Sequence, residues 1–203
     1  MADVSVIPMP ADDLQLSMLE RISRERGADP QKMASDFVSE NKHKTVSLIN
    51  PSGAKFMIGD LEDTMYRGKY NEVNGWGNFY LPEKVRMQVI GVVEGTSCPC
   101  DELVLMICCE DAQVYAYDGE EEELHLVASS LEQLLHVGIE YPASKSYYKG
   151  EAFKDVTEED WAEVRNSDVG RRLDEEHHKL VMSKKSELLK NLKSTKHTTG
   201  VYS

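Results

Sequence analysis

One continuous stretch, residues 85–141, restricts what this chain can fold into. Four short segments within it either alternate apolar and polar residues or are apolar throughout. Such patterns are typical of half-buried and of central β-strands. The apolar spacing then changes to a helical period at Leu131, Leu134 and Leu135. The stretch therefore predicts a meander of strands that ends in one amphipathic helix, which we expect to begin with a capping box formed by Ser129 and Glu132.

The residues before the meander predict two helices and a hairpin. Apolar residues recur about every four positions over 12–26, and Asp29 followed by Pro30 is typical of the start of a second helix. Two β-prone segments, 45–49 and 55–58, flank a turn-forming sequence and predict a β-hairpin.

Less regular segments are expected elsewhere in the chain. Residues 67–78 are rich in Gly and Asn and predict a loop that holds Trp76 as a half-buried anchor. Residues 143–156 predict a linker loop, and 157–193 predict a C-terminal helical extension. Residues 194–203 have no periodicity and are expected to be disordered.

Together these segments predict an α+β fold. We expect a single domain over residues 10–142, with a twisted antiparallel sheet of five or six strands and flanking helices, because the strands are clustered and do not alternate with helices. The predicted core consists of Leu103, Leu105, Ile107, Val114, Leu126, Leu131 and Leu134.

Charge is unevenly distributed along the chain. The formal net charge is −13, and residues 171–203 contain eight basic and four acidic residues. That segment therefore carries +4, which leaves −17 on residues 1–170. An acidic body disfavours nucleic acid and favours a basic protein partner, although acidity alone is also a common means of keeping a protein soluble.

The four cysteines do not form a recognisable catalytic or metal-binding motif. Cys98 and Cys100 are separated by one residue, and Cys108 and Cys109 are adjacent. Zinc knuckles usually separate their cysteines by two to four residues, and adjacent strand residues point to opposite faces. We therefore expect no catalytic residue, no metal and no cofactor. The clustering also favours reduced thiols in an intracellular compartment.

No apolar run reaches the roughly 20 residues that span a bilayer, and the first residues do not resemble a secretory signal. We expect a cytoplasmic protein without a membrane partner, and a nuclear location is compatible with the same sequence.

The meander resembles the SUKH superfamily, the group of Smi/Knr-type, Syd-type and herpesviral US-twenty-two-type domains. The resemblance covers about residues 85–141. It is carried by Val89-Ile90-Gly91, Leu103-Val104-Leu105, Val114 to Asp118, Leu126-Val127-Ala128, Ser130-Leu131, Leu134-Leu135 and Gly138-Ile139. The family usually has an Asp-x-Gly turn before its Val-Tyr strand, whereas this chain has Glu110-Asp111-Ala112.

The resemblance implies a binding module and not an enzyme. Bacterial members resemble immunity proteins that bind toxins, and viral members are associated with opposing host defence. By analogy, we expect this chain to capture and neutralise a partner protein. The expected contact surface combines aromatic anchors with an acidic rim, namely Trp76, Tyr80, Tyr115, Tyr117, Asp118, Glu120, Glu121 and Glu122. Packing of these aromatics inside the domain is the alternative for each of them.

Two further functions remain open from the sequence. One is a zinc-dependent hydrolase that uses Cys98, Cys100 and His125. The other is nucleic-acid binding through the basic C-terminal helix. The sparse apolar stripe within residues 171–193 also predicts docking of this helix, either on the acidic body or on a second copy as a homodimer.

Overall fold

The computed structural model describes residues 11–24, 27, 29–98, 100 and 102–196. It divides into two compact units, Met1–Lys154 and Asp155–Ser203, which we call the sheet domain and the C-terminal unit.

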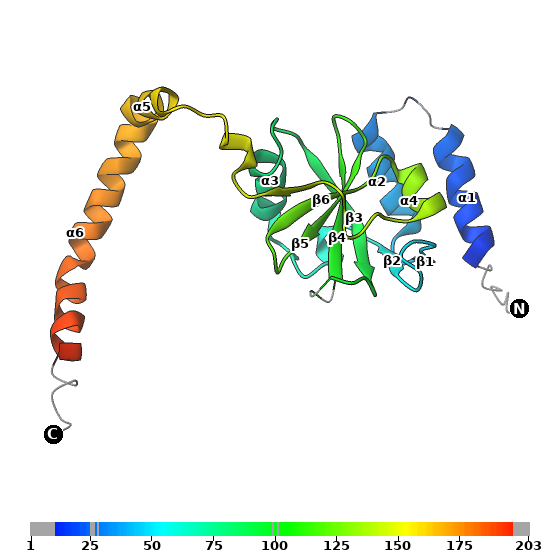
Figure 1. The fold of residues 1–203 in the computed structure, drawn as a ribbon, viewed down its shortest axis with the longest axis horizontal. Helices are drawn as coiled ribbons and strands as arrows, with labels where there is room; N and C mark the ends of the chain where they lie inside the picture. The colour runs from blue at the N-terminus through cyan, green and yellow to red at the C-terminus, as the bar shows by residue number, and fades with distance from the viewer. Residues whose placement is uncertain (1–10, 25–26, 28, 99, 101, 197–203) are drawn as a thin grey trace, which may run out of the picture. The chain divides into compact units, whose positions relative to one another are not determined.

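The sheet domain combines helices with one sheet (Figure 1). Its helical elements are α1 (Ala11–Arg24), α2 (Pro30–Asn41), the 3-10 turn η1 (Leu61–Asp63), α3 (Tyr70–Phe79), α4 (Leu131–Val137) and the 3-10 turn η2 (Glu151–Phe153). Its strands are β1 (Thr45–Ser47), β2 (Lys55–Ile58), β3 (Met87–Glu94), β4 (Glu102–Cys108), β5 (Val114–Asp118), β6 (Glu123–Ala128) and β7 (Ser146–Tyr148).

The sheet is a seven-stranded meander in which every strand pairs antiparallel with the next along the chain. The α+β class and the antiparallel sheet are therefore confirmed. The expected count of five or six strands was too low because β7 lies within residues 143–156, which were predicted as a linker loop. This three-residue strand buries only Tyr147, so its sequence gives little alternation to recognise.

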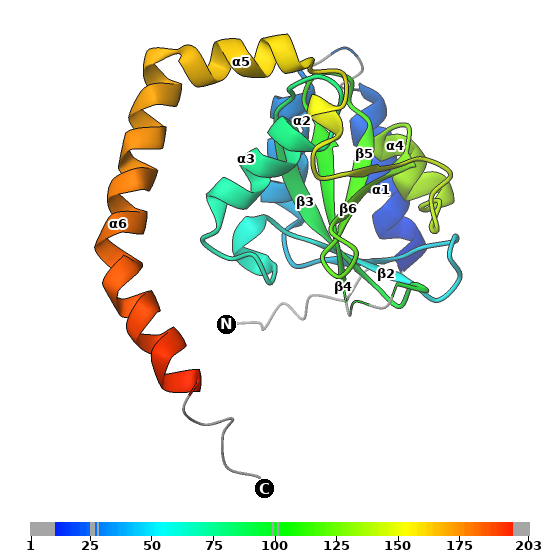
Figure 2. The ribbon, with the colours of Figure 1, turned by 60° about the vertical axis from the view of Figure 1, so that its left-hand side comes forward.

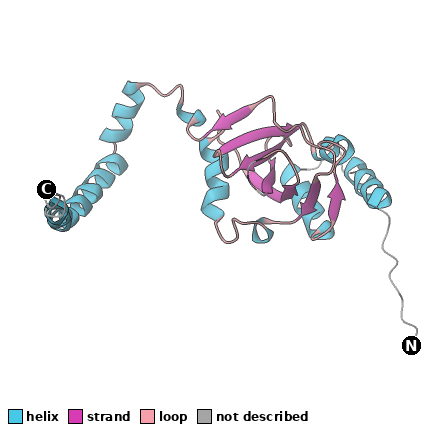
Figure 3. Cartoon of the chain, turned by 60° about the horizontal axis from the view of Figure 1, so that its bottom comes forward, coloured by secondary structure: helices cyan, strands magenta, loops and turns pink. Residues whose placement is uncertain are grey.

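Helices cover the sheet on both faces (Figures 1–3). On one face, α1, α2 and α4 pack against the sheet, and the core between them includes the predicted residues Leu103, Leu105, Ile107 and Val114 of the strands and Leu131 and Leu134 of α4. Leu126 was placed wrongly in this set. It is only partly buried and packs in the second core, on the opposite face, together with Leu124. Strand alternation puts the two leucines on one side of β6.

The second core contains a helix where the sequence predicted a loop. Residues 70–79 form α3 despite two glycines and three asparagines. Trp76 is only 1% exposed, and Gly77 packs so closely on the next segment that a Cβ there would lie 2.2 Å from the Val85 carbonyl oxygen. Tertiary packing of Trp76 therefore stabilises a helix that intrinsic propensity disfavours.

Side-chain caps fix the starts of two helices in the sheet domain. Asp29 caps α2 as predicted, accepting a hydrogen bond from the Gln31 backbone at 3.2 Å. The cap of α4 is one residue later than predicted. Ser130, not Ser129, accepts from the Gln133 backbone at 3.1 Å, and the Gln133 side chain accepts from the Ser129 backbone.

A clasp joins the β1–β2 hairpin to the end of α4. The Asn50 carbonyl accepts from the Ile139 backbone at 2.8 Å, and the Asn50 side chain donates to the Ile139 carbonyl at 2.7 Å. Gly138 has φ +104°, and a Cβ there would lie 2.0 Å from the Asn50 carbonyl oxygen. This contact links segments that are far apart in the sequence.

The C-terminal unit is helical, as expected. It consists of α5 (Glu158–Asn166), which begins with a Thr157–Asp160 capping box, and α6 (Asp168–Lys196). Residues 194–196 were predicted to be disordered but belong to α6; residues 197–203 lie outside the described part of the chain. Leu173, Leu180 and Leu189 of the predicted stripe are exposed.

Candidate functional site

The four aromatic residues predicted as partner anchors are all buried. Trp76, Tyr80, Tyr115 and Tyr117 form part of the second core. The Trp76 and Tyr117 ring centroids lie 4.6 Å apart, and the Tyr80 hydroxyl approaches the Tyr117 hydroxyl at 3.5 Å. These side chains therefore pack within the domain, in the core between α3 and the sheet, and do not present a surface.

Asp118, the fifth predicted contact residue, organises an acidic turn from inside the fold. It is 1% exposed, and its Oδ1 accepts hydrogen bonds from the Glu120 and Glu121 backbones at 2.9 and 3.2 Å. The side chains of Glu120, Glu121 and Glu122 are exposed on this turn. Three of the eight predicted contact residues are thus available to a partner.

Further carboxylates gather at the same end of the sheet. Glu94 of β3 is directly opposite Glu102 of β4, and Asp118 of β5 is opposite Glu123 of β6. We call this set the acidic end: Glu94, Glu102, Asp118, Glu120, Glu121, Glu122 and Glu123. Like charges directly opposite across strands are destabilising, so this arrangement opposes folding slightly. Lys55 of β2 is opposite Glu94 on its other side.

Glu94 and Glu102 were not among the contact residues predicted from the sequence. They flank the loop that contains Cys98 and Cys100, so recognition of that loop as a hairpin turn would have placed them opposite each other. Tyr148 of β7 was also not predicted; it is opposite Glu123 of β6 and is 53% exposed. Tyr148 is therefore an exposed aromatic beside the acidic end.

The loop after η1 packs against the acidic end. The Met65 backbone donates to Glu102 Oε1 at 3.0 Å, and a Cβ at Gly119 would lie 2.6 Å from the Tyr66 hydroxyl. Burial of its phenol, together with the neighbouring Tyr117, raises the pKa of Tyr66 to about 12. Tyr66 therefore supports the acidic turn in its neutral form.

A groove of about 420 Å³ lies on the other side of η1. It is lined by Asp60, Leu61, Glu62, Tyr70, Val73, Asn74, Met87, Gln88 and Val89. Its described lining includes two carboxylates and no basic residue. Glu62 accepts a hydrogen bond from the Tyr70 hydroxyl at 2.8 Å, and Asp60 pairs with Lys42 at 2.6 Å.

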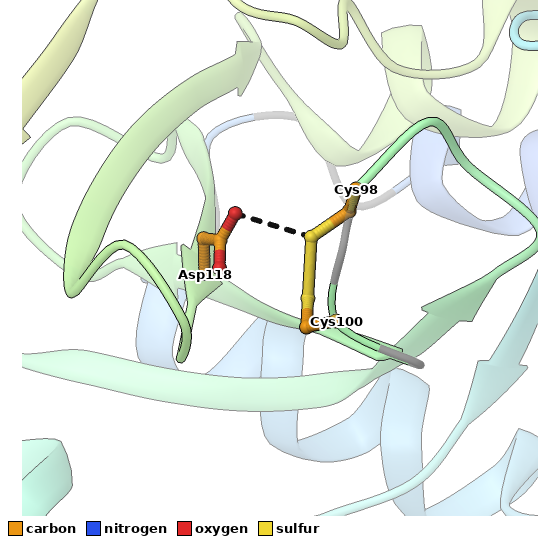
Figure 4. Close-up of side chains that lie close together, drawn as sticks. All are labelled: Cys98, Cys100 and Asp118. Carbon is orange, nitrogen blue, oxygen red and sulfur yellow. Dashed lines mark hydrogen bonds between the residues drawn. A yellow bond between two sulfur atoms is a disulfide. The ribbon is translucent and has the colours of Figure 1, made fainter.

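Cys98 and Cys100 lie beside Asp118 (Figure 4). Their sulfurs are joined in a disulfide, which corrects the expectation of reduced thiols for this pair. Cys98 Sγ lies 3.1 Å from Asp118 Oδ2, and the Tyr141 hydroxyl donates to the same oxygen at 3.0 Å. A disulfide sulfur has no proton, so the sulfur–carboxylate contact becomes a hydrogen bond only when Cys98 is a thiol or Asp118 is protonated.

The hypothesis of a zinc-dependent hydrolase required His125 to lie beside Cys98 and Cys100, and it does not. Among the described residues, the group of possible ligand atoms within 4.8 Å of one another consists of Cys98, Cys100 and Asp118. The His125 ring packs edge-on against Tyr141, with centroids 5.3 Å apart. Neither ring nitrogen of His125 has a hydrogen-bond partner within the part of the chain that the structure describes.

The second pair of cysteines is buried in strand β4 and just after it. Cys108 and Cys109 are free thiols. Burial, with Asp111 nearby, raises the pKa of Cys108 to about 12, so its nucleophilic thiolate is scarce near neutral pH. These residues are at the opposite end of β4 from Glu102.

Comparison with known proteins decides the family. Residues 28–146, from just before α2 to the start of β7, match the family described as US22 like. The chain belongs to the US22-like family. This result confirms the resemblance to the SUKH superfamily, whose herpesviral branch carries this domain type, and it extends the similarity beyond residues 85–141.

The relatives of this US22-like chain are viral proteins. It is 37% identical over 142 residues to uncharacterized protein 005R of frog virus 3 (isolate Goorha), an alignment that covers 67% of each chain. It is 32% identical over 100 residues to the uncharacterized gene 87 protein of gallid herpesvirus 2, covering 49% of this chain and 55% of the relative. It is also 32% identical over 81 residues to uncharacterized protein FPV250 of fowlpox virus, covering 40% and 56%.

Neither the family description nor these names assign a chemical reaction to the US22-like chain. No solved structure matches it. Within the described residues, none of its helices has the length and apolarity needed to span a bilayer.

Proposed function

We propose that this US22-like domain is a non-enzymatic binding module that captures a basic surface of a partner protein through its acidic end. The observation that carries the proposal is the collection of carboxylates on β3 to β6, including the directly opposed pair Glu94 and Glu102. In a viral protein of this family, such capture would serve to oppose a host defence protein or a toxin-like effector.

The energetics of the acidic end support a role in binding. Opposed carboxylates reduce the stability of the folded domain by up to roughly 1 kcal/mol for each pair. A basic partner would relieve this repulsion as it docks. Part of the binding free energy would therefore come from removing the repulsion between carboxylates that is present in the free protein. Complementary charge also steers diffusional encounter and discriminates against acidic proteins.

The exposed residues define which side chains would make contact. Glu120, Glu121 and Glu122 are accessible on the turn that Asp118 holds. Tyr148 takes the role of aromatic anchor in place of the four buried aromatics, because it is exposed and opposite Glu123. Aromatic side chains with a charged rim are a common composition for protein interfaces.

Affinity capture from host-cell lysate with a charge-reversed control tests the proposal. The variant Glu120→Lys/Glu122→Lys changes the acidic end, whereas Glu159→Lys/Glu163→Lys makes the same change in net charge on the exposed surface of α5. We expect partners bound by the unmodified protein to be lost by the first variant, retained by the second, and released by added salt. Equal recovery by both variants, or capture that does not depend on Glu120 and Glu122, would contradict the proposal.

A further inference from the structure

The contact between Cys98, Cys100 and Asp118 combines three groups that can each donate an electron pair to a metal. Cys98 Sγ is 3.1 Å from Asp118 Oδ2, and all three ligand atoms lie within 4.8 Å of one another. Both cysteines are partly exposed, whereas Asp118 is buried. The group is therefore open to solvent on its sulfur side and fixed on its carboxylate side.

Asp118 is oriented by hydrogen bonds that leave one direction free for the sulfurs. Its Oδ1 accepts from the Glu120 and Glu121 backbones, and its Oδ2 accepts from the Tyr141 hydroxyl at 3.0 Å. A carboxylate has about four lone-pair sites. Three are occupied by these donors, and the fourth position is the one at which Cys98 Sγ lies.

We propose that the reduced form of this protein binds one Zn²⁺ ion through Cys98 Sγ, Cys100 Sγ and Asp118 Oδ2, and that the disulfide is the metal-free form of the same site. Tyr141 is a positioning residue, since it holds the carboxylate oxygen without bonding to the metal. The inference is independent of the function proposed above.

Conversion of the disulfide form into the zinc-bound form requires a reductant and releases two protons. Two equivalents of a thiol reductant, such as glutathione, cleave the Cys98–Cys100 bond and give two protein thiols and one oxidised reductant disulfide. Zinc then displaces the two thiol protons, because the thiolate is the ligand. In this exchange the protein sulfurs gain two electrons and the zinc ion keeps its oxidation state.

The donor set suits zinc in both type and spacing. Thiolates at about 2.3 Å and a carboxylate oxygen at about 2.1 Å are ordinary zinc ligands in tetrahedral sites. Those bond lengths place tetrahedral donors roughly 3.6–3.8 Å apart. Opening the disulfide separates the sulfurs, and the sulfur–carboxylate pair is already at 3.1 Å, so small side-chain rotations suffice. Water can take the fourth position on the exposed sulfur side.

This donor set also favours binding over hydrolysis. Two thiolates and one carboxylate contribute three negative charges, so a zinc complex with a neutral water carries a net charge of −1. A surplus of negative ligand charge weakens the ability of the metal to ionise its bound water, in contrast to a site of three neutral histidines.

Zinc titration of the full-length protein tests the site. Protein is reduced, freed of reductant under inert gas and titrated with Zn²⁺ against a chromophoric chelator; a second sample is kept oxidised. We expect one equivalent bound by the reduced sample and none by the oxidised sample. Cys100→Ser should abolish stoichiometric binding, Asp118→Asn should weaken it by about tenfold or more, and Tyr141→Phe should weaken it by roughly 10–100-fold.

Cys109→Ala is the matched control, because Cys109 is a free cysteine outside the group. It should bind one equivalent like the unmodified protein. Circular dichroism of each variant establishes that it is folded. Cys100→Ser is the decisive variant, because Cys100 is only partly buried and its substitution is expected to leave the core folded. Absence of stoichiometric binding by the reduced protein, or unchanged binding by Cys100→Ser, would overturn the site. Unchanged binding by Asp118→Asn would overturn the assignment of its carboxylate as a ligand.

Discussion

The indole ring of Trp76 lies on the phenol ring of Tyr117, with centroids 4.6 Å apart and planes tilted by 35°. Tyr66 contacts both rings edge-on. This aromatic cluster attaches α3 to β5 and lies beneath the loop that supports the acidic turn. Its integrity therefore determines both the stability of the domain and the position of the loop around Tyr66.

Truncation of this cluster should destabilise the sheet domain strongly. We expect Trp76→Ala to lower the free energy of unfolding by about 3–5 kcal/mol, because it removes a large, fully buried side chain and leaves a cavity. Chemical denaturation followed by circular dichroism measures the change. Tyr70→Ala on the same helix, where the side chain is 61% exposed, should stay within about 1 kcal/mol. Similar losses for the two variants would show that α3 does not pack as described.

The clasp between Asn50 and Gly138 can be tested with two glycines. Gly53→Ala introduces a side chain at φ +91° with open space around it, so only backbone strain of about 1–2 kcal/mol is expected. Gly138→Ala adds the same kind of strain and a collision with the Asn50 carbonyl. We expect it to destabilise the domain by at least about 2 kcal/mol more than Gly53→Ala. Equal thermal shifts for the two variants would exclude a tight approach at Gly138.

Tyr66 should contribute to alkaline sensitivity. Its pKa is raised from 10.0 to about 12 in the folded domain, chiefly by burial. The unfolded chain therefore ionises first, so stability is unaffected below about pH 10 and falls as the pH rises towards 12. Tyr66→Phe should reduce the slope of stability against pH in this window, and Tyr148→Phe, which removes an exposed phenol, is the control. An unchanged slope in Tyr66→Phe would contradict this prediction.

Helix α6 is expected to mediate a homodimer. Leu173 and Leu180 are exposed on one side of this helix, and a sparse stripe of this kind does not stabilise an isolated helix in water. Light scattering should give a dimer for the full chain and a monomer for a chain ending at Gly170. Leu180→Glu should dissociate the dimer, whereas Met182→Glu makes the same charge change on the opposite side of the helix and should not. A monomeric full chain would rule out this role.

Sequence patterns were most informative for segments whose structure depends mainly on their own local residues. The six strands from β1 to β6, the start of α2 at Asp29 and the stripe of α4 follow from local periodicity and capping. Helix α3 could not be predicted locally, because the burial of Trp76 outweighs the low helix propensity of its glycines and asparagines.

The candidate site was harder to predict than the fold. Residues two apart on a strand share a face, so Tyr115 and Tyr117 lie on one side of β5, but this alternation does not indicate that α3 covers that side. The proximity of Asp118 to Cys98 and Tyr141 depends on the end of β5, the β3–β4 loop and the segment after α4 coming together. Such contacts leave no periodic signal in a single sequence.

The sequential strand order has one consequence for how the domain can diversify. In a meander, alternate connections emerge at the same end, so the β1–β2, β3–β4 and β5–β6 hairpin loops lie together, while the segments that contain α3 and α4 connect strands at the other end. The acidic end is thus built from the ends of strands β3 to β6 and the short hairpin connections between them. The β3–β4 and β5–β6 loops can change in length or residue content without altering the strand order, whereas the β1–β2 loop is held by the contacts of Asn50, so the same scaffold can present different contact residues at this end.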